Sequence, residues 1–225
     1  MNDVSRYRLQ KLAWLKGIKK PRATCGSCLK PLATCYCREI EKIPTPIKFA
    51  ILIHPLEARR AIATGRMAHL CLLGSSLIRG LDFSKCEELN NLLNNPQYFA
   101  MILFPGETST RLDQLSLNNR QSFVPKGLTP LVLVIDGTWR TANKMLRLNP
   151  QLVKLPRISF LPSKISSFQV RKQPRDECFS TLEAIAAVLN LFGVPGGESL
   201  LKPFHYMNAQ QLKFMAKPHP RVRIR

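Results

Sequence analysis

Three short apolar runs, each followed by turn-forming residues, constrain the fold of this chain more than any other feature. They are IKFAILI (47–53), YFAMILF (98–104) and LVLVI (131–135), and polar residues do not alternate regularly with apolar ones in any of them. Helix-like segments separate the runs. Strands that are apolar on both faces are typical of a parallel sheet covered by helices on both sides. The sequence therefore predicts an α/β fold with a mostly parallel sheet.

The other expected elements follow from periodicity and from turn residues. They are a helix over about 57–72, a short apolar piece near 76–79, a helix around 140–148 that Pro150 closes, a strand over 156–161, and helices at 180–192 and near 208–216. The Pro-rich segment EKIPTPIKF divides the chain. We expect a basic arm and a cysteine-rich segment in residues 1–44, and the main domain in residues 45–225.

The chain is strongly basic, with 34 Lys and Arg against 14 Asp and Glu and a formal net charge of +20. Nine cations lie in residues 140–175 without one acid, seven lie in the first 22 residues beside one acid, and five lie in residues 213–225 without any. A basic surface that only aids solubility is one interpretation. Three separate basic segments favour a phosphate backbone as the partner, so we expect nucleic-acid binding.

Four of the seven cysteines lie close together, at Cys25, Cys28, Cys35 and Cys37. Their spacing, C-x2-C-x6-C-x-C, suits the four thiolate ligands of a tetrahedral zinc ion. Free thiols or a pair of disulfides are the alternatives. A segment this short has almost no core, so metal binding would supply most of its folding free energy. We expect a structural zinc ion in a small N-terminal knuckle, which would also suit a grip on RNA.

The sequence predicts no membrane partner, because its apolar runs fall well short of the ~20 residues that a membrane helix needs. The N-terminal residues also lack the continuous apolar core of a secretory signal. We therefore expect a cytoplasmic protein. No sequence feature indicates an obligate protein partner.

Polar and turn-forming residues follow three of the predicted strands. They form the segments His54–Glu57, Pro105–Ser109 and Asp136–Trp139. Ligands of open α/β sheets bind outside the carboxyl ends of the strands. Gly106 and Gly137 would let the backbone approach such a ligand closely. The sequence thus predicts a ligand site along one rim of the sheet.

Asp136 and Trp139 each allow two interpretations. Asp136 would cap the following helix, or it would act as a general base at the strand end. Thr138 or Thr141 would serve equally well as the cap, so Asp136 is not needed there. Trp139 would pack in the core, or it would form the surface on which a planar base stacks.

The segment before the helix at 180–192 is also open to two interpretations. Ser180-Thr181-Leu182-Glu183 is a capping box, which explains Glu183 without any catalytic role. The same helix N-terminus follows Arg171, Lys172 and Arg175. A helix N-terminus beside cations would bind a carboxylate or a phosphate.

Taken in chain order, these motifs resemble the DTW-domain family. They are CxxC…CxC, HPxE, LFPG, VIDGTWxxAxKML and RKQPRxxCxSTLEA, between about residues 25 and 215. The Asp-x-Thr-Trp motif that names the family matches Asp136-Gly137-Thr138-Trp139. The DGTW and STLEA motifs at this separation are highly specific in combination.

The resemblance implies a fold and an activity. The family is related to the SPOUT superfamily, whose α/β sheet carries a C-terminal trefoil knot, and nothing besides the resemblance implies the knot. Bacterial members that are similar to this chain are tRNA-uridine aminocarboxypropyltransferases. Such an enzyme transfers the 3-amino-3-carboxypropyl group of S-adenosylmethionine to N3 of a tRNA uridine, here expected in the variable loop, and releases methylthioadenosine.

The resemblance also implies roles for individual residues. Asp136, Thr138 and Trp139 are the catalytic candidates, with Asp136 as acceptor of the N3 proton and Trp139 as the support for the uracil or adenine ring. Arg171 and Ser180–Thr181 would bind the α-carboxylate of the transferred group. The residues expected to bind S-adenosylmethionine are Leu103, Phe104, Pro105, Gly106, Asp136, Gly137, Arg171, Ser180, Thr181 and Glu183.

Two other functions fit parts of the sequence. A SPOUT-type tRNA methyltransferase would use the same co-substrate but would release S-adenosylhomocysteine. A non-catalytic zinc-knuckle RNA-binding protein would explain the charge and the cysteines. That function leaves the strand-end acid and the rim loops without a purpose, and failure to bind S-adenosylmethionine would favour it.

Overall fold

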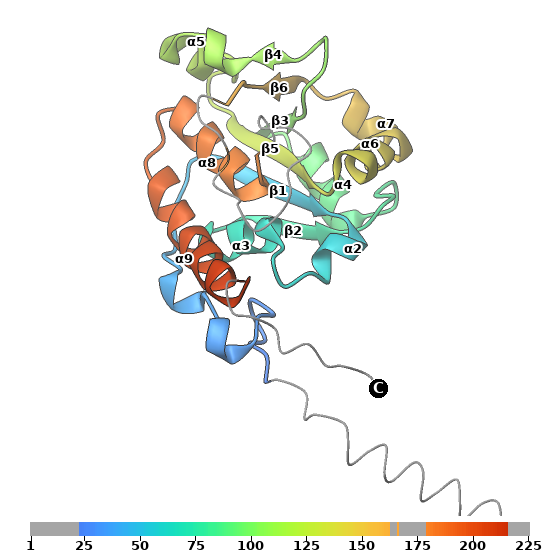
Figure 1. Ribbon diagram of the computed structural model, residues 1–225. Coiled ribbons are helices and arrows are strands. Elements are labelled where there is room, and N and C mark those ends of the chain that lie inside the picture. The colour runs from blue at the N-terminus through green and yellow to red at the C-terminus, as the bar shows by residue number, and fades with distance from the viewer. Residues whose placement is uncertain (1–22, 163–165, 167–178, 216–225) are drawn as a thin grey trace, which may run out of the picture.

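A six-stranded sheet crosses the centre of the molecule in the computed structural model, which describes residues 23–162, Ser166 and residues 179–215 (Figure 1). The strand order is β2-β1-β5-β3-β6-β4, and every pairing is parallel. The strands are β1 (Lys48–Ile53), β2 (Ser76–Arg79), β3 (Tyr98–Leu103), β4 (Thr110–Arg111), β5 (Thr129–Asp136) and β6 (Arg157–Ser159). The predicted α/β class and parallel sheet are confirmed.

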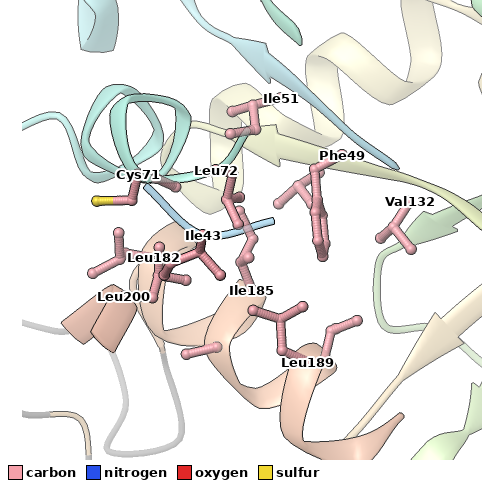
Figure 2. Packing of buried hydrophobic residues seen from close by; sticks show 14 of the residues in the cluster. Ile43, Phe49, Ile51, Cys71, Leu72, Val132, Leu182, Ile185, Leu189 and Leu200 are labelled. Carbon is pink, nitrogen blue, oxygen red and sulfur yellow. The ribbon is translucent and has the colours of Figure 1, made fainter. Parts of the chain in front are cut away.

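Helices cover both faces of the sheet. One face carries α3 (Thr64–Cys71), α8 (Thr181–Leu191) and α9 (Gly197–Met215), and the other carries α4 (Glu87–Asn94), α6 (Trp139–Leu148) and α7 (Pro150–Val153). Alternate residues of each central strand face opposite sides. Phe49 and Ile51 pack against Ile185 and its neighbours (Figure 2), whereas Leu52 belongs to a second buried cluster with Met145. This two-sided burial explains why these strands are apolar throughout.

The shorter elements lie in the connections around the sheet and in the cysteine-rich segment. They are α2 (Pro55–Ala58), α5 (Leu117–Ser122) and the 3-10 helices η1 (Leu32–Thr34), η2 (Cys37–Glu39) and η3 (Leu112–Gln114). The sequence prediction missed α4, α5, α7 and β4, and Pro150, which was expected to close the helix around 140–148, begins α7. Among the described helices, none has the length and apolar character that crossing a membrane requires.

The helix predicted over 57–72 is wrong in one respect, because the structure divides it into α2 and α3. The chain turns between them, at residues 59–63. The guanidinium group of Arg66 donates hydrogen bonds to the carbonyls of Ala58 and Arg60, and so holds this turn. A side chain that satisfies backbone carbonyls outside a helix makes the break possible.

The last helix is longer than predicted, since α9 begins at Gly197 rather than near residue 208. Pro203 lies inside it, although proline removes one hydrogen bond from a helix interior. Leu200, Phe204 and Met207 on the same helix are fully buried. Burial of this apolar face therefore outweighs the local preference for a break.

The cysteine-rich segment packs against α9. Arg38 donates a hydrogen bond from Nη2 to the Tyr206 hydroxyl at 2.8 Å, and its guanidinium carbon lies 4.7 Å from the centre of the tyrosine ring. Cys28, Tyr36 and Ile43 belong to the same buried cluster as the apolar residues of α8 and α9. The described part of the segment before position 45 thus shares a core with the sheet domain.

Candidate functional site

The three predicted loops lie at neighbouring strand ends. The strands β1, β5 and β3 are adjacent and parallel, so His54, Asp136 and Phe104 follow or end strands at one rim of the sheet. The backbone N–H of His54 donates to the carbonyl of Asp136 at 2.9 Å, which joins two of the loops directly. The end of β6 continues the rim beyond β3.

A cavity of about 690 Å³ opens at this rim. Its volume lies within the range of small-molecule sites, and its walls combine aromatic side chains with a few polar groups, as such sites do. The lining residues are Leu103, Phe104, Pro105, Val134, Ile135, Gly137, Trp139, Ala142, Ser159, Phe160, Leu161, Pro162, Phe179, Thr181 and Ala184.

Trp139 forms part of the cavity wall. It is the first residue of α6, and 45% of its surface is exposed, so it is not a core aromatic. Its ring meets the ring of Phe104 edge to face, with centroids 5.9 Å apart and planes at 71°. This contact orients a large aromatic surface at the cavity and favours the stacking interpretation of Trp139.

Asp136 lies behind the cavity wall and is buried. Its Oδ1 accepts a hydrogen bond from the Thr181 hydroxyl at 2.6 Å, and its Oδ2 accepts one from the Gly65 N–H at 3.1 Å. Thr181 itself lines the cavity. The carboxylate therefore connects β5 to the N-termini of α3 and α8, and Thr181 stands between it and the cavity.

Gly65 is required by this arrangement. A Cβ atom at this position would lie 2.4 Å from Oδ2 of Asp136 and 3.0 Å from Cγ2 of Ile51. Both distances are shorter than ordinary van der Waals contact. Because Gly65 has no side chain, the first turn of α3 can lie directly against the Asp136 carboxylate.

Thr138 is the cap of α6. Its hydroxyl accepts a hydrogen bond from the Thr141 N–H at 3.3 Å, so Asp136 is not the capping residue. Gly137 precedes it, and a Cβ atom there would lie 2.7 Å from the Thr141 hydroxyl oxygen. Gly137 lines the cavity, whereas the Thr138 side chain serves the start of the helix.

The predicted capping box is present at the start of α8. The Ser180 hydroxyl accepts from the Glu183 N–H at 3.3 Å, and Glu183 Oε2 accepts from the Ser180 N–H at 2.9 Å. The Ser166 hydroxyl also donates to the buried Glu183 carboxylate. Ser180 and Glu183 therefore hold the helix terminus, and Thr181 is the residue of this group that reaches the cavity. Arg171 lies outside the described residues.

One part of the loop after β3 lines the cavity, and the other part is exposed at the surface. Leu103, Phe104 and Pro105 line the cavity, but Gly106 lies beyond it on the exposed side. The Gly106 carbonyl accepts from the Ser109 hydroxyl at 2.7 Å, and Ser109 and Ser159 share a hydrogen bond at 2.8 Å. These bonds connect the loop to the end of β6.

Several cavity residues were not predicted from the sequence. Ser159 and Phe160–Pro162 follow β6, and the rule that places ligands at strand ends would have included them, because a strand over 156–161 was predicted. Phe179 precedes α8, and its ring lies 5.9 Å from that of Phe160. Gly65 gave no local signal, because its partner lies 71 residues further along the chain.

The four N-terminal cysteines form a second candidate site. Their sulfur atoms all lie within 4.8 Å of one another. Cys25 Sγ lies 3.7 Å from Cys37 Sγ, and Cys28 Sγ lies 3.6 Å from Cys35 Sγ. Zn–S bonds of ~2.3 Å in tetrahedral geometry separate the sulfur atoms by ~3.8 Å. The four thiols therefore fit one zinc ion.

Backbone N–H groups near Cys25 favour its thiolate form, which is the form that binds a metal ion. The N–H groups of Cys28 and Ser27 lower the pKa of the Cys25 thiol to about 6, while burial raises the pKa values of Cys35 and Cys37. Zinc binds thiolates rather than thiols. A zinc ion bound here would offset the cost of burying the negative charges of Cys35 and Cys37. Leu29 has a φ of +58° within this turn, between Cys28 and Lys30.

Comparison with known proteins gives consistent results. The model of the DTW domain matches residues 22–212. A tRNA-uridine aminocarboxypropyltransferase 2 of Drosophila melanogaster is 28% identical over 88% of this chain and 78% of the relative, and the Mus musculus enzyme of that name is 28% identical over 87% and 66%. The tRNA-uridine aminocarboxypropyltransferase A of Arabidopsis thaliana is 28% identical over 89% and 86%. No solved structure matches the chain.

The matched residues include both candidate sites. They extend from before the first cysteine of the cluster, through the Asp136-Gly137-Thr138-Trp139 motif, into α9. Because the match covers most of the chain, this protein belongs to the DTW domain family.

Proposed function

We propose that this protein transfers the 3-amino-3-carboxypropyl group of S-adenosylmethionine to N3 of a uridine in the tRNA variable loop. Curated relatives that share most of its length are named tRNA-uridine aminocarboxypropyltransferases. The observation that carries the proposal is the strand-end cavity, whose wall includes Gly137 and Trp139 of the family motif. Its volume and mixed lining suit a nucleoside-sized ligand.

The chemistry makes simple demands on the site. N3 of the uridine forms a bond to the γ-carbon of the donor, the bond between that carbon and the sulfonium sulfur breaks, and methylthioadenosine leaves. N3 must also give up its proton. Because the sulfonium charge already activates the donor, the enzyme mainly has to align the methylene, rather than the methyl group, with N3.

We assign proton acceptance to Asp136, acting through Thr181. Thr181 lines the cavity and donates a 2.6 Å hydrogen bond to Asp136 Oδ1. As N3 gives its proton to the Thr181 oxygen, the hydroxyl proton of Thr181 passes to the carboxylate. The Gly65 N–H supports the other carboxylate oxygen. A positioned acid–base group of this kind contributes roughly 10² to 10⁴ in rate.

The remaining walls suit the rest of the two substrates. We assign Leu103–Pro105 and Gly137 to the adenosine part of the donor, and Trp139 to a stacked base. The N-terminus of α8 suits the donor carboxylate, since a helix N-terminus favours anions. Arg171 is assigned to the same carboxylate on the basis of its place in the family motif.

The proposal extends to the fold and its setting. The parallel sheet with a ligand cavity at its strand ends supports a SPOUT relationship, and a crystal structure that traces residues 163–178 would test the C-terminal knot. We assign a structural role to a zinc ion held within residues 1–44, and we assign catalysis to residues 45–225. We propose that the reaction takes place in the cytoplasm.

The decisive experiment is a reaction with S-adenosylmethionine and unmodified bulk tRNA, analysed by mass spectrometry. Methylthioadenosine together with an aminocarboxypropyl nucleoside is the expected result. S-adenosylhomocysteine would show a methyltransferase instead. Binding of tRNA without either product, and without binding of S-adenosylmethionine, would show a non-catalytic RNA-binding protein.

A single variant tests the assigned acceptor in the same assay. Asp136→Asn should abolish transfer while S-adenosylmethionine still binds in isothermal titration calorimetry, because an amide does not take up the proton. A thermal unfolding curve shows whether the variant is folded. Full activity of a folded Asp136→Asn protein would refute the assignment of Asp136.

A further inference from the structure

We propose that the outer face of α6 is the surface along which the tRNA backbone lies when the target base enters the cavity. This inference rests on the proposed function for the identity of the RNA. Its central residues are Arg140, Lys144 and Arg147, which we call the α6 stripe. All three side chains are exposed.

The α6 stripe is one continuous face of the helix. Residues separated by four and by three positions lie next to each other on a helix, so the three cations form a single row. Ala142, Met145 and Leu146 form the buried side of α6 and fix its orientation against the sheet. The row is about 10 Å long from Arg140 to Arg147, at 1.5 Å per residue, and so faces more than one backbone phosphate.

The cations of the stripe are not neutralised by acids in the described part of the chain, where no ion pair includes any of them. Elsewhere in the described residues, some acids pair with individual cations. Arg111 pairs with Asp113 at 2.6 Å, and Lys202 pairs with Glu41 at 2.5 Å. Residues 140–175 contain no acid at all. The stripe therefore presents uncompensated positive charge to solvent, which is what a polyanion binds.

The stripe also begins at the cavity. Trp139, which lines the cavity, is the residue immediately before Arg140 and belongs to the same helix. A base stacked on Trp139 would bring its own phosphates to the first turn of α6. The helix N-terminus adds to the attraction for phosphate. One element thus carries both the aromatic support for the base and the cations for its backbone.

The test compares two triple variants that remove the same charge. Arg140→Gln/Lys144→Gln/Arg147→Gln removes the stripe, and Lys42→Gln/Lys85→Gln/Lys126→Gln removes three exposed cations in loops outside the three basic segments. Binding of unmodified tRNA is measured by fluorescence anisotropy at several KCl concentrations, without S-adenosylmethionine. We expect the stripe variant to bind at least tenfold more weakly at 0.1 M KCl and to reduce the slope of log K against log salt by about two.

Each outcome decides the proposal. A smaller slope and weaker binding in the stripe variant, with an unchanged slope in the control, support it. An unchanged slope and affinity in the stripe variant would overturn it. Equal weakening of both variants would show a response to net charge alone and would overturn it. Because binding is measured without the reaction, the result stands even if no aminocarboxypropyl product forms, so failure of the proposed function is distinguishable.

Discussion

At the scale of single residues, the contact between Asp136 and Thr181 is the centre of the site. Thr181 joins a buried carboxylate to a cavity that the carboxylate does not line. The sequence could suggest Asp136, because it ends an apolar strand. It could not suggest the pairing, since the two residues are 45 positions apart and meet only through the packing of α8 on the sheet.

Two substitutions at Thr181 distinguish the contribution of its hydroxyl group from that of its side-chain volume. Thr181→Val keeps the volume but removes the donor to Asp136, and we expect kcat to fall by about 10² or more. Thr181→Ser keeps the hydroxyl and should retain most of the activity. Single-turnover rates of methylthioadenosine release measure both. Equal losses in the two variants would mean that Thr181 acts by packing alone.

Gly65 supplies a second residue-scale prediction. Gly65→Ala places a Cβ 2.4 Å from Oδ2 of Asp136, although alanine is the better helix former by up to ~1 kcal/mol. We expect a lower melting temperature and loss of transfer. Gly26→Ala is the control, since its Cβ meets nothing within 4 Å. A Gly65→Ala protein with unchanged stability and activity would contradict the fixed position of the carboxylate.

At the scale of elements, the helices and strands that were correctly predicted are those whose buried apolar residues recur regularly along the sequence. The strands β1, β3 and β5 are apolar on both faces, and their predicted bounds hold to within a few residues. The helices α4 and α5 were missed because Leu89 is the only fully buried residue of the first and the second has none. The first half of α9 was not predicted because Gly197 and Pro203 disfavour a helix locally. Its stability comes from tertiary packing instead.

The cysteine knuckle is the element whose ligand is most directly measurable. We expect one zinc ion per chain by inductively coupled plasma mass spectrometry, and its loss in Cys28→Ser. Cys86→Ser is the control, because Cys86 lies outside the cluster. Serine is a much poorer zinc ligand than thiolate. Zinc retained at full occupancy in Cys28→Ser would rule out the four-thiolate site.

At the scale of the whole molecule, the cysteine segment and the sheet share one buried cluster. Cys28 and Tyr36 pack with apolar residues of α8 and α9, and Lys30 donates a 3.4 Å hydrogen bond to Gln211. The sequence predicts a boundary near residue 45, and these contacts cross it from the described residues before that position. Contacts of this kind couple the two parts, because unfolding one exposes apolar surface of the other.

This coupling predicts that removing zinc destabilises the catalytic cavity at a distance. In a Trp14→Phe variant, Trp139 is the only tryptophan, and its fluorescence reports the cavity wall. Because the knuckle and α8 share a core, chelation should lower the melting temperature seen by Trp139 by about 5 °C or more, in a single transition. Cys28→Ser should give the same shift without chelator, and Cys86→Ser should give none. A Trp139 transition that chelation leaves unchanged would instead establish residues 1–44 as an independent unit, with α9 stable in its absence.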